Sequence, residues 1–357
     1  MKRLYAALLC VFVFHASQAA GNAVATVDQK ENAAPIDEGE KRARAAGQSL
    51  VGTQGPALTL KTIDGQQIDL SALRGKQPVY LKFWATWCVP CRKQMPGFER
   101  IYQKHGKNIT VIAVNTGFSD NEAAIRALKG KVAMNMPIVI DDGNLAGALN
   151  VRVTPTHVLI GRDGRIAHIG HLDDDKLHAA LARVLASDSD TGAIATAQPV
   201  AKHSPANVFK RGDVVTEMSV TTTDGKTVSL AATNGKPRAL VFTAPWCESY
   251  LAQSRPAVSQ ACRRVRVESE RLAKNGGTEW LAISSGLWAS EQDLLDYKVA
   301  EKVDIPLALD ADGKVFRAFN IRQIPTVVLM DGSNRIVQVL GPNDRDLKKA
   351  IQSLRSQ

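Results

Sequence analysis

Residues 84–96, which read WATWCVPCRKQMP, constrain the fold of this chain more than any other stretch. They contain Cys88 and Cys91, whose spacing allows a small and reversible disulfide. Residues 78–84 form an apolar run typical of a strand, and residues 92–104 predict a helix, so Cys88 falls where a strand leads into a helix N-terminus. The free amides and dipole at that end favour a thiolate. The sequence therefore predicts that Cys88 attacks a disulfide and that Cys91 resolves the intermediate.

A Cys-x-x-Cys pair is also half of many zinc sites. Such a site normally needs a second pair of ligands at a recognisable spacing, and the sequence has none. We therefore expect no metal and no cofactor. Pro90, between the two cysteines, suits the first turn of a helix, where a backbone N–H is not needed.

The motif Phe-Trp-Ala-Thr-Trp-Cys-x-Pro-Cys, followed by a proline five residues later, resembles the thioredoxin-like family. Within that family it is similar to the TlpA/ResA branch of periplasmic thiol:disulfide oxidoreductases. The resemblance implies an α/β fold with a central mixed sheet flanked by helices. It also implies that Thr154 and Pro155 form a cis-proline loop facing the disulfide. Trp87 would cover the disulfide, and Trp84 would lie in the core.

The strand and helix pattern predicts a thioredoxin-like domain with the Cys-x-x-Cys pair over residues 50–186. A second region, residues 209–357, repeats four features of the first in the same order: a hairpin around Asp-Gly, a Gly-Lys-x-x strand ending in Trp-Cys, a second Asp-Gly turn, and a Pro-Thr loop before a strand. We therefore expect two tandem thioredoxin-like domains, the second degenerate.

The second domain departs from the first at its active-site position. It has Cys247, but Tyr250 stands where a resolving cysteine would be. Cys262 is the other candidate partner, yet 15 residues of straight helix would span roughly 22 Å, whereas a disulfide needs Cα atoms about 4.4–6.8 Å apart. Pro256 between them predicts a break that allows the bond. We favour a Cys247–Cys262 disulfide in a domain whose cis-proline position is Pro325; a free thiol or a non-catalytic docking domain are the alternatives.

Two residues of the first domain differ from those usual in the family. Family members often carry Asn or an acidic residue where this chain has Lys82, and the TlpA/ResA branch usually has Glu where this chain has Gln94. Neither position can therefore provide a carboxylate base. If Lys82 points at the sulfurs, its charge stabilises the thiolate and makes the disulfide more oxidising. In the alternative, its stem is packed and its ammonium reaches solvent.

The remaining segments are expected to direct export and to connect the domains. Residues 1–19 combine Lys2 and Arg3 with a short apolar run and small residues, which predicts a cleaved signal peptide and no stable membrane insertion afterwards. Residues 20–49 are expected to be a flexible or partly helical tether, and residues 187–208 an interdomain linker. The formal charge of +10 is spread along the chain without a nucleic-acid motif, so no nucleic-acid partner is expected.

The expected function is that of a periplasmic thiol:disulfide oxidoreductase. The resemblance implies a reductase fed by a membrane electron donor, acting on exported proteins with cysteines or disulfides, including those of cytochrome c biogenesis or of copper sites. An oxidase or isomerase is the enzymatic alternative. The non-enzymatic alternative is a binding protein that captures a client protein or copper, with the second domain as a docking unit.

Overall fold

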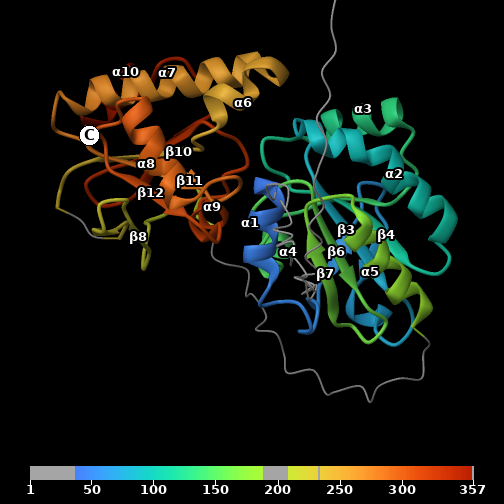
Figure 1. Cartoon of the computed structure of the whole chain (residues 1–357). Coiled ribbons are helices and arrows are strands. Elements are labelled where there is room, and N and C mark those ends of the chain that lie inside the picture. The colour runs from blue at the N-terminus through green and yellow to red at the C-terminus, as the bar shows by residue number, and fades with distance from the viewer. Residues whose placement is uncertain (1–36, 188–207, 232–233, 356–357) are drawn as a thin grey trace, which may run out of the picture. The chain divides into compact units, whose positions relative to one another are not determined.

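A computed structural model describes residues 37–187, 208–231 and 234–355. Residues 37–357 fall into one compact unit. The predicted signal peptide and nearly all of the predicted linker lie outside the described residues. The α/β prediction with two thioredoxin-like domains is confirmed, because each domain is built on a mixed sheet of five strands with helices packed against it (Figure 1).

The first domain alternates strands and helices along the chain. Its elements are α1 (Glu38–Gly47), β1 (Thr59–Lys61), β2 (Gln67–Asp69), η1 (Ser71–Leu73), β3 (Val79–Trp84), α2 (Val89–His105), β4 (Thr110–Asn115), α3 (Glu122–Val132), β5 (Ile138–Ile140), α4 (Asn144–Ala148), β6 (Thr156–Ile160), β7 (Ile166–Gly170) and α5 (Asp175–Ala186).

The central strand β3 determines where the cysteines lie. The five-stranded sheet has the order β5-β4-β3-β6-β7, in which β3 runs parallel to β4 and antiparallel to β6. All six residues of β3 are buried, as expected for a strand covered on both faces. Tyr80 and Trp84 face the core beneath α2, while Leu81 and Phe83 face the opposite core. The chain leaves β3 at Trp84 and enters α2 just after Cys88.

The N-terminal helix α1 lies in the segment expected to be flexible or partly helical, and it packs on β7. Ala43 is buried, and a Cβ atom at Gly39 or Gly47 would collide with His171 or Ile169, so this face of the helix sits tightly on the sheet edge. The Glu40 carboxylate accepts the backbone N–H groups of His171 and Leu172. These contacts make the helix part of the first domain.

The second domain repeats this design. Its sheet has the order β12-β11-β10-β13-β14, the same pattern as the first. Its elements are β8 (Ser219–Thr221), β9 (Thr227–Ser229), β10 (Arg238–Thr243), α6 (Cys247–Ser254), α7 (Pro256–Ala273), β11 (Glu279–Ser285), α8 (Glu291–Ala300), β12 (Leu307–Asp310), α9 (Lys314–Ala318), β13 (Thr326–Met330), β14 (Ile336–Leu340) and α10 (Leu347–Arg355).

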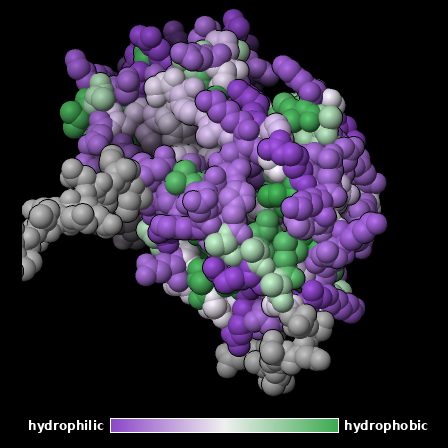
Figure 2. Space-filling model, turned by 45° about the vertical axis from the view of Figure 1, so that its right-hand side comes forward, coloured by the Kyte–Doolittle hydropathy of each residue, from purple (hydrophilic) through white to green (hydrophobic). Residues whose placement is uncertain are grey.

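The residues at the surface are mostly hydrophilic. Figure 2 shows hydrophilic residues over most of the visible face, interrupted by small hydrophobic patches. Among the described residues, no helix has the length and apolar character needed to cross a membrane.

Candidate active site

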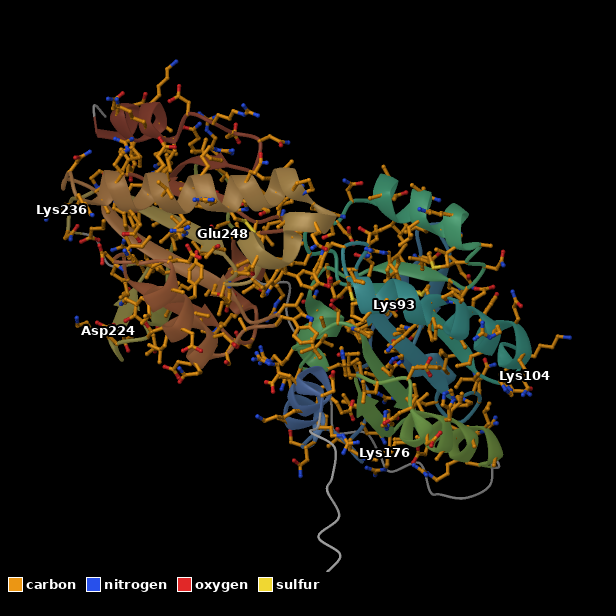
Figure 3. All side chains as sticks on the ribbon, turned by 45° about the horizontal axis from the view of Figure 1, so that its top comes forward. Lys93, Lys104, Lys176, Asp224, Lys236 and Glu248 are labelled. Atoms are coloured by element: carbon orange, nitrogen blue, oxygen red, sulfur yellow. A yellow bond between two sulfur atoms is a disulfide. The ribbon has the colours of Figure 1, made fainter. Side chains whose placement is uncertain are left out.

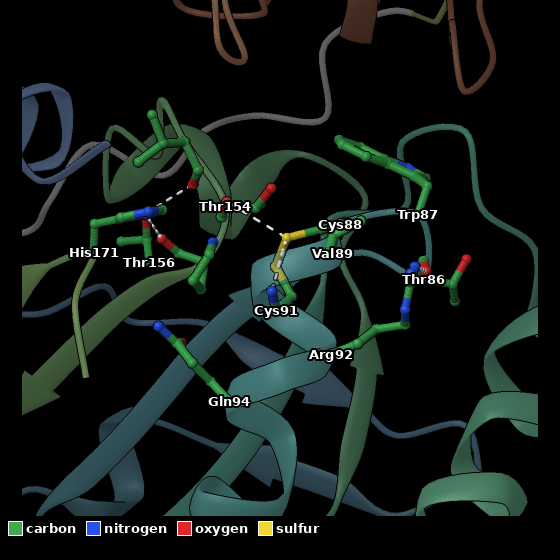
Figure 4. Close-up of a disulfide and its surroundings, with 12 residues drawn as sticks. Thr86, Trp87, Cys88, Val89, Cys91, Arg92, Gln94, Thr154, Thr156 and His171 are labelled. Atoms are coloured by element: carbon green, nitrogen blue, oxygen red, sulfur yellow. Dashed lines mark hydrogen bonds between the residues drawn. A yellow bond between two sulfur atoms is a disulfide. The ribbon is translucent and has the colours of Figure 1, made fainter. Parts of the chain in front are cut away.

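A disulfide joins Cys88 and Cys91 at the N-terminal end of α2, with Cα atoms 5.3 Å apart (Figure 4). Cys88 is the N-cap of the helix, and its sulfur accepts the backbone N–H of Cys91 at 3.2 Å. Pro90 occupies the first turn, as expected. When the bond is reduced, this N–H and the helix dipole stabilise a thiolate on Cys88. The geometry therefore suits Cys88 for nucleophilic attack.

A loop with a cis peptide bond between Thr154 and Pro155 faces this disulfide, as expected. The Thr154 carbonyl oxygen lies 3.5 Å from the Cys88 sulfur, so it is placed to accept a hydrogen bond from the Cys88 thiol when the disulfide is reduced (Figure 4). The His171 ring donates from Nδ1 to the Pro155 carbonyl at 2.6 Å, and the Thr156 hydroxyl donates to the Val153 carbonyl at 2.8 Å. These bonds hold the loop rigidly against the cysteines.

A buried carboxylate that the sequence did not single out fixes the turn before Cys88. Asp120 accepts the backbone N–H of Thr86 at 2.7 Å and the side-chain amide of Asn115 at 2.8 Å. The Trp87 indole N–H donates to the Phe118 carbonyl at 2.8 Å. The position of Asp120 after a strand and before a helix N-cap was the available signal, but such loops are common in α/β domains.

Beneath the disulfide, a chain of neutral hydrogen bonds crosses the core. The Tyr80 hydroxyl lies 2.8 Å from Nδ1 of His157, and Nε2 of His157 lies 3.0 Å from the Gln94 side-chain oxygen. Since the Gln94 oxygen only accepts, Nε2 carries the proton and Nδ1 accepts from Tyr80. Burial, and then the nearby charge of Lys82, hold the pKa of His157 well below its usual value, so the ring stays neutral. Gln94 thus binds a histidine that the sequence analysis missed.

The structure rules out one of the two alternatives for the Lys82 side chain, the one in which its ammonium reaches solvent. Its ammonium does not reach solvent, because the residue has 0% exposure. The side chain lies on the face of β3 that α2 covers, and Nζ lies 5.4 Å from the centroid of the Phe98 ring. Burial lowers the pKa of Lys82 to about 7, although the Asp173 carboxylate opposes this shift. At neutral pH a large share of Lys82 is therefore uncharged.

Residues from the second domain contact the rim of the site. The Trp246 ring stacks on Trp87 with centroids 5.1 Å apart, and the Tyr250 hydroxyl accepts the backbone N–H of Val89 at 3.2 Å. Arg255 forms an ion pair with Asp120 at 2.7 Å. With these contacts in place Cys88 is buried, with 1% exposure.

The second domain holds a disulfide of a different kind. Cys247 begins α6, and a break at Arg255 and Pro256 turns the chain into α7, which brings Cys262 to a Cα distance of 6.2 Å. The bond joins Cys247 to Cys262, as favoured from the sequence. Pro325, which follows a cis peptide bond, lines a small cavity of about 20 Å³ together with Cys262.

Comparisons with known proteins agree with this geometry. Residues 51–169 match the AhpC/TSA family, and residues 210–353 match the Redoxin family. The thioredoxin-like protein YneN of Bacillus subtilis (strain 168) is 34% identical over 133 residues, which cover 36% of this chain and 78% of YneN. The thiol-disulfide oxidoreductase ResA of the same strain is 33% identical over 132 residues, which cover 36% of this chain and 72% of ResA. The chain belongs to the thioredoxin-like thiol-disulfide oxidoreductases.

This oxidoreductase carries two thioredoxin-like domains in tandem. The match to each of these relatives covers little more than a third of the oxidoreductase chain. Among solved structures, it is similar to the exposed lipoprotein thioredoxin Etrx1 of Streptococcus pneumoniae strain TIGR4. The identity is 28% and the TM-score 0.31, with 36% of this chain and 96% of Etrx1 covered. The Cys88–Cys91 pair is the Cys-x-x-Cys motif of this family.

Proposed function

We propose that this oxidoreductase reduces disulfides of exported proteins in the periplasm. The observation that carries the proposal is the placement of Cys88 at the N-terminus of α2, opposite the carbonyl of Thr154 in the cis-proline loop. A helix N-terminus activates the thiolate, and the rigid loop offers a backbone edge to an extended polypeptide. The predicted signal peptide over residues 1–19 supports export.

The reaction proceeds in two exchanges. The Cys88 thiolate attacks one sulfur of the client disulfide, which forms a mixed disulfide and releases the second client sulfur as a thiolate. The Cys91 thiolate then attacks the Cys88 sulfur and expels the first client sulfur. Cys88 and Cys91 lose two electrons and the client gains them, with its two thiolates taking up the protons that the enzyme thiols lose. An electron donor, for which a membrane protein is our expectation, must then reduce the Cys88–Cys91 bond.

The second domain would act as a removable cover and docking unit. It has no cysteine at the position of Tyr250 for a Cys-x-x-Cys cycle. Its Trp246 and Tyr250 contact the rim where a client would bind. Client binding would therefore compete with these contacts.

The reduction potential of the Cys88–Cys91 pair tests the direction of the reaction. The full chain is equilibrated with glutathione buffers, alkylated, digested and analysed by mass spectrometry, which reports each cysteine pair separately. A reductase predicts a potential near that of thioredoxin, about −270 mV. A potential near about −120 mV would overturn the proposal and favour the oxidase or isomerase alternative.

A further inference from the structure

A loop of the second domain places a tryptophan beside the cis-proline loop that faces Cys88. Trp288 lies between β11 and α8 and is half-buried. Its backbone N–H donates to the carbonyl of Arg152 at 2.7 Å, and its indole N–H donates to the hydroxyl of Thr154 at 3.4 Å. Its ring meets the His171 ring edge to face, with centroids 5.4 Å apart. Trp288 thus binds the residue whose carbonyl lies against the Cys88 sulfur.

The backbone of Trp288 has a conformation that is rare for a bulky residue. Its φ is +55°, in the left-handed region that L-residues avoid. A residue is held there by its surroundings, and such residues are frequent at binding contacts. For Trp288 the surroundings include the bonds to Arg152 and Thr154. The helix α8 that follows is also fastened to the first domain, through an ion pair between Arg42 and Asp293 at 2.8 Å.

The first domain offers the equivalent loop to the second domain, but with a small residue. Ser119, between β4 and α3, also has a positive φ, and its backbone N–H donates to the carbonyl of Arg322 at 2.6 Å. Its hydroxyl accepts the backbone N–H of Ile324 at 3.4 Å. Arg322 and Ile324 precede the second cis-proline as Arg152 and Thr154 precede the first. Backbone pairing of this kind therefore does not require an aromatic ring.

The surface that receives the Trp288 ring differs between the two domains at both positions that touch it. The second domain has Ile324 in place of Thr154, and Gly341 follows β14 where His171 follows β7. These two positions of the second domain thus lack the hydroxyl and the ring that bind Trp288. A threonine hydroxyl accepts an indole N–H, and an imidazole ring packs against an aromatic edge. The loop beside the Cys-x-x-Cys pair therefore has the features of an aromatic subsite.

The contacts of Trp288 match those that a client residue would make. A client joined to Cys88 must pass the Thr154 carbonyl, and an extended segment can pair with the backbone edge of residues 152–154. Groups two residues apart in an extended chain point the same way. A client that pairs with this edge would therefore place the residue two positions from its cysteine at the Arg152 carbonyl, where the N–H of Trp288 now binds.

We propose that the Arg152 carbonyl, the Thr154 hydroxyl and the His171 ring form a subsite for an aromatic residue of the client. Trp288 occupies this subsite while no client is bound. The inference rests on the proposed function, because it names the class of client that the Cys88 site takes: an extended segment with an aromatic residue two positions from its reactive cysteine. Tryptophan fits best, since its indole N–H reaches the Thr154 hydroxyl as that of Trp288 does. A client with such a residue displaces the Trp288 ring, whereas a client without one leaves it in place.

Peptides with one cysteine blocked by thionitrobenzoate test the subsite in the reduced full-length protein. The residue two positions before or after the cysteine is tryptophan, phenylalanine or alanine. The Cys88 thiolate attacks the peptide sulfur and thionitrobenzoate leaves as a coloured thiolate, which reports the rate. The Cys91 thiolate then forms the Cys88–Cys91 bond and expels the peptide thiolate.

The variant Trp288→Ala should reveal the preference for an aromatic residue. At one of the two peptide positions, the tryptophan peptide should react at least ~fivefold faster than the alanine peptide, with phenylalanine between them. In the wild type this ratio should be smaller, because the tryptophan peptide must displace Trp288. Adding Thr154→Val to Trp288→Ala removes the hydroxyl and keeps the shape, so the tryptophan peptide should slow to the rate of the phenylalanine peptide.

The control is Lys236→Ala, which changes an exposed side chain ahead of β10 in the same domain as Trp288 (Figure 3). It should keep the wild-type ratios. Equal rates for the tryptophan and alanine peptides at both positions in Trp288→Ala would overturn the inference. If no peptide released thionitrobenzoate from the wild type, the proposed function itself would be contradicted instead.

A second measurement does not depend on a change at Trp288. The Cys91→Ser variant, labelled with ¹⁵N, is joined through Cys88 to each unlabelled peptide, and the indole N–H signal of Trp288 is followed by NMR. The tryptophan peptide should move this signal toward that of an exposed indole, while the alanine peptide should leave it unchanged. A signal that the two peptides affect equally would overturn the inference.

Discussion

The nitrogen of Lys82 lies 5.4 Å from the centre of the Phe98 ring, inside a core that solvent does not reach. A lysine in such a place loses hydration, and among the described residues the Phe98 ring face and the Asp173 carboxylate offset part of that loss. The residue is therefore costly to the fold. This cost has a measurable signature in the stability of the protein.

Replacing Lys82 by methionine should stabilise the protein in a pH-dependent way. Because burial lowers the pKa of Lys82 from 10.5 to about 7, the unfolded state binds more protons than the folded state between these values. Below pH 7 the wild type bears the full cost of the buried charge, roughly 5 kcal/mol. From pH 7 to pH 9 the wild type should regain roughly 2–3 kcal/mol relative to Lys82→Met.

Guanidinium unfolding at these two pH values measures that difference. Lys93→Met serves as the control. Because Lys93 is exposed, the difference in free energy of unfolding between this variant and the wild type should be the same at both pH values. If the free energies of unfolding of Lys82→Met and the wild type differed by the same amount at pH 7 and pH 9, the expected titration would be contradicted.

Shortening Tyr250 should expose the active-site cysteine. The hydroxyl of Tyr250 accepts the Val89 N–H next to Cys88, and its ring contacts Trp87. Tyr250→Ala removes both contacts, so iodoacetamide should alkylate reduced Cys88 several times faster. Val299→Ala, which changes an exposed side chain on α8, is the control. An unchanged alkylation rate in Tyr250→Ala would show that this residue does not limit access to Cys88.

Removing the Glu40 carboxylate should detach α1 from β7. Burial opposes ionisation of Glu40, but bonds from the His171 N–H and from Arg44 hold its pKa below the usual value. Glu40→Ala leaves buried N–H groups without an acceptor and should cost about 2 kcal/mol at neutral pH. Since the folded pKa is lowered, this contribution is present above pH 4.5 and is lost as the pH falls through the folded pKa.

Chemical unfolding near pH 7 and near pH 3 checks this expectation. The matched control is Glu38→Ala on the same helix, whose side chain is 57% exposed and which should change stability little. Equal stabilities of Glu40→Ala and the wild type at neutral pH would be inconsistent with a structural role for this carboxylate.

The second disulfide should contribute stability rather than exchange activity. Cys247 and Cys262 enclose a loop of 15 residues, and closing a loop of that size stabilises a protein by roughly 3 kcal/mol. The double variant Cys247→Ser and Cys262→Ser should lose about this amount in unfolding experiments. It should keep glutathione exchange at Cys88, and loss of that exchange would show that the second pair takes part in the reaction.

Much of this arrangement follows from local sequence signals. The apolar run of β3 and Pro90 in the first helical turn indicated where α2 and its disulfide begin, the family resemblance implied the mixed sheet, and the repeat extended that expectation to the second domain. Pro256 also indicated the break that brings Cys247 and Cys262 together. These signals succeed because they act over short stretches of chain.

The layer beneath the disulfide was not predictable in the same way. The chain of Tyr80, His157 and Gln94 joins three elements that are far apart in the sequence, and a histidine within an apolar strand gives no sign of its partners. The side-chain direction of Lys82 was also open, since lysine stems pack in many surroundings. The sequence allowed a partly helical segment at α1 but did not predict its packing on β7, because that attachment depends on Glu40 and two glycines rather than on an apolar stripe.

Trapping the mixed disulfide tests the central claim, that Cys88 attacks and Cys91 resolves, most directly. Reduced Cys91→Ser and Cys88→Ser variants are each incubated with glutathione disulfide and analysed by intact mass and peptide mapping. The account predicts that Cys91→Ser accumulates one glutathione on Cys88, while Cys88→Ser reacts slowly through the buried Cys91. Rapid modification of Cys91 in Cys88→Ser, with little adduct on Cys88 in Cys91→Ser, would contradict it.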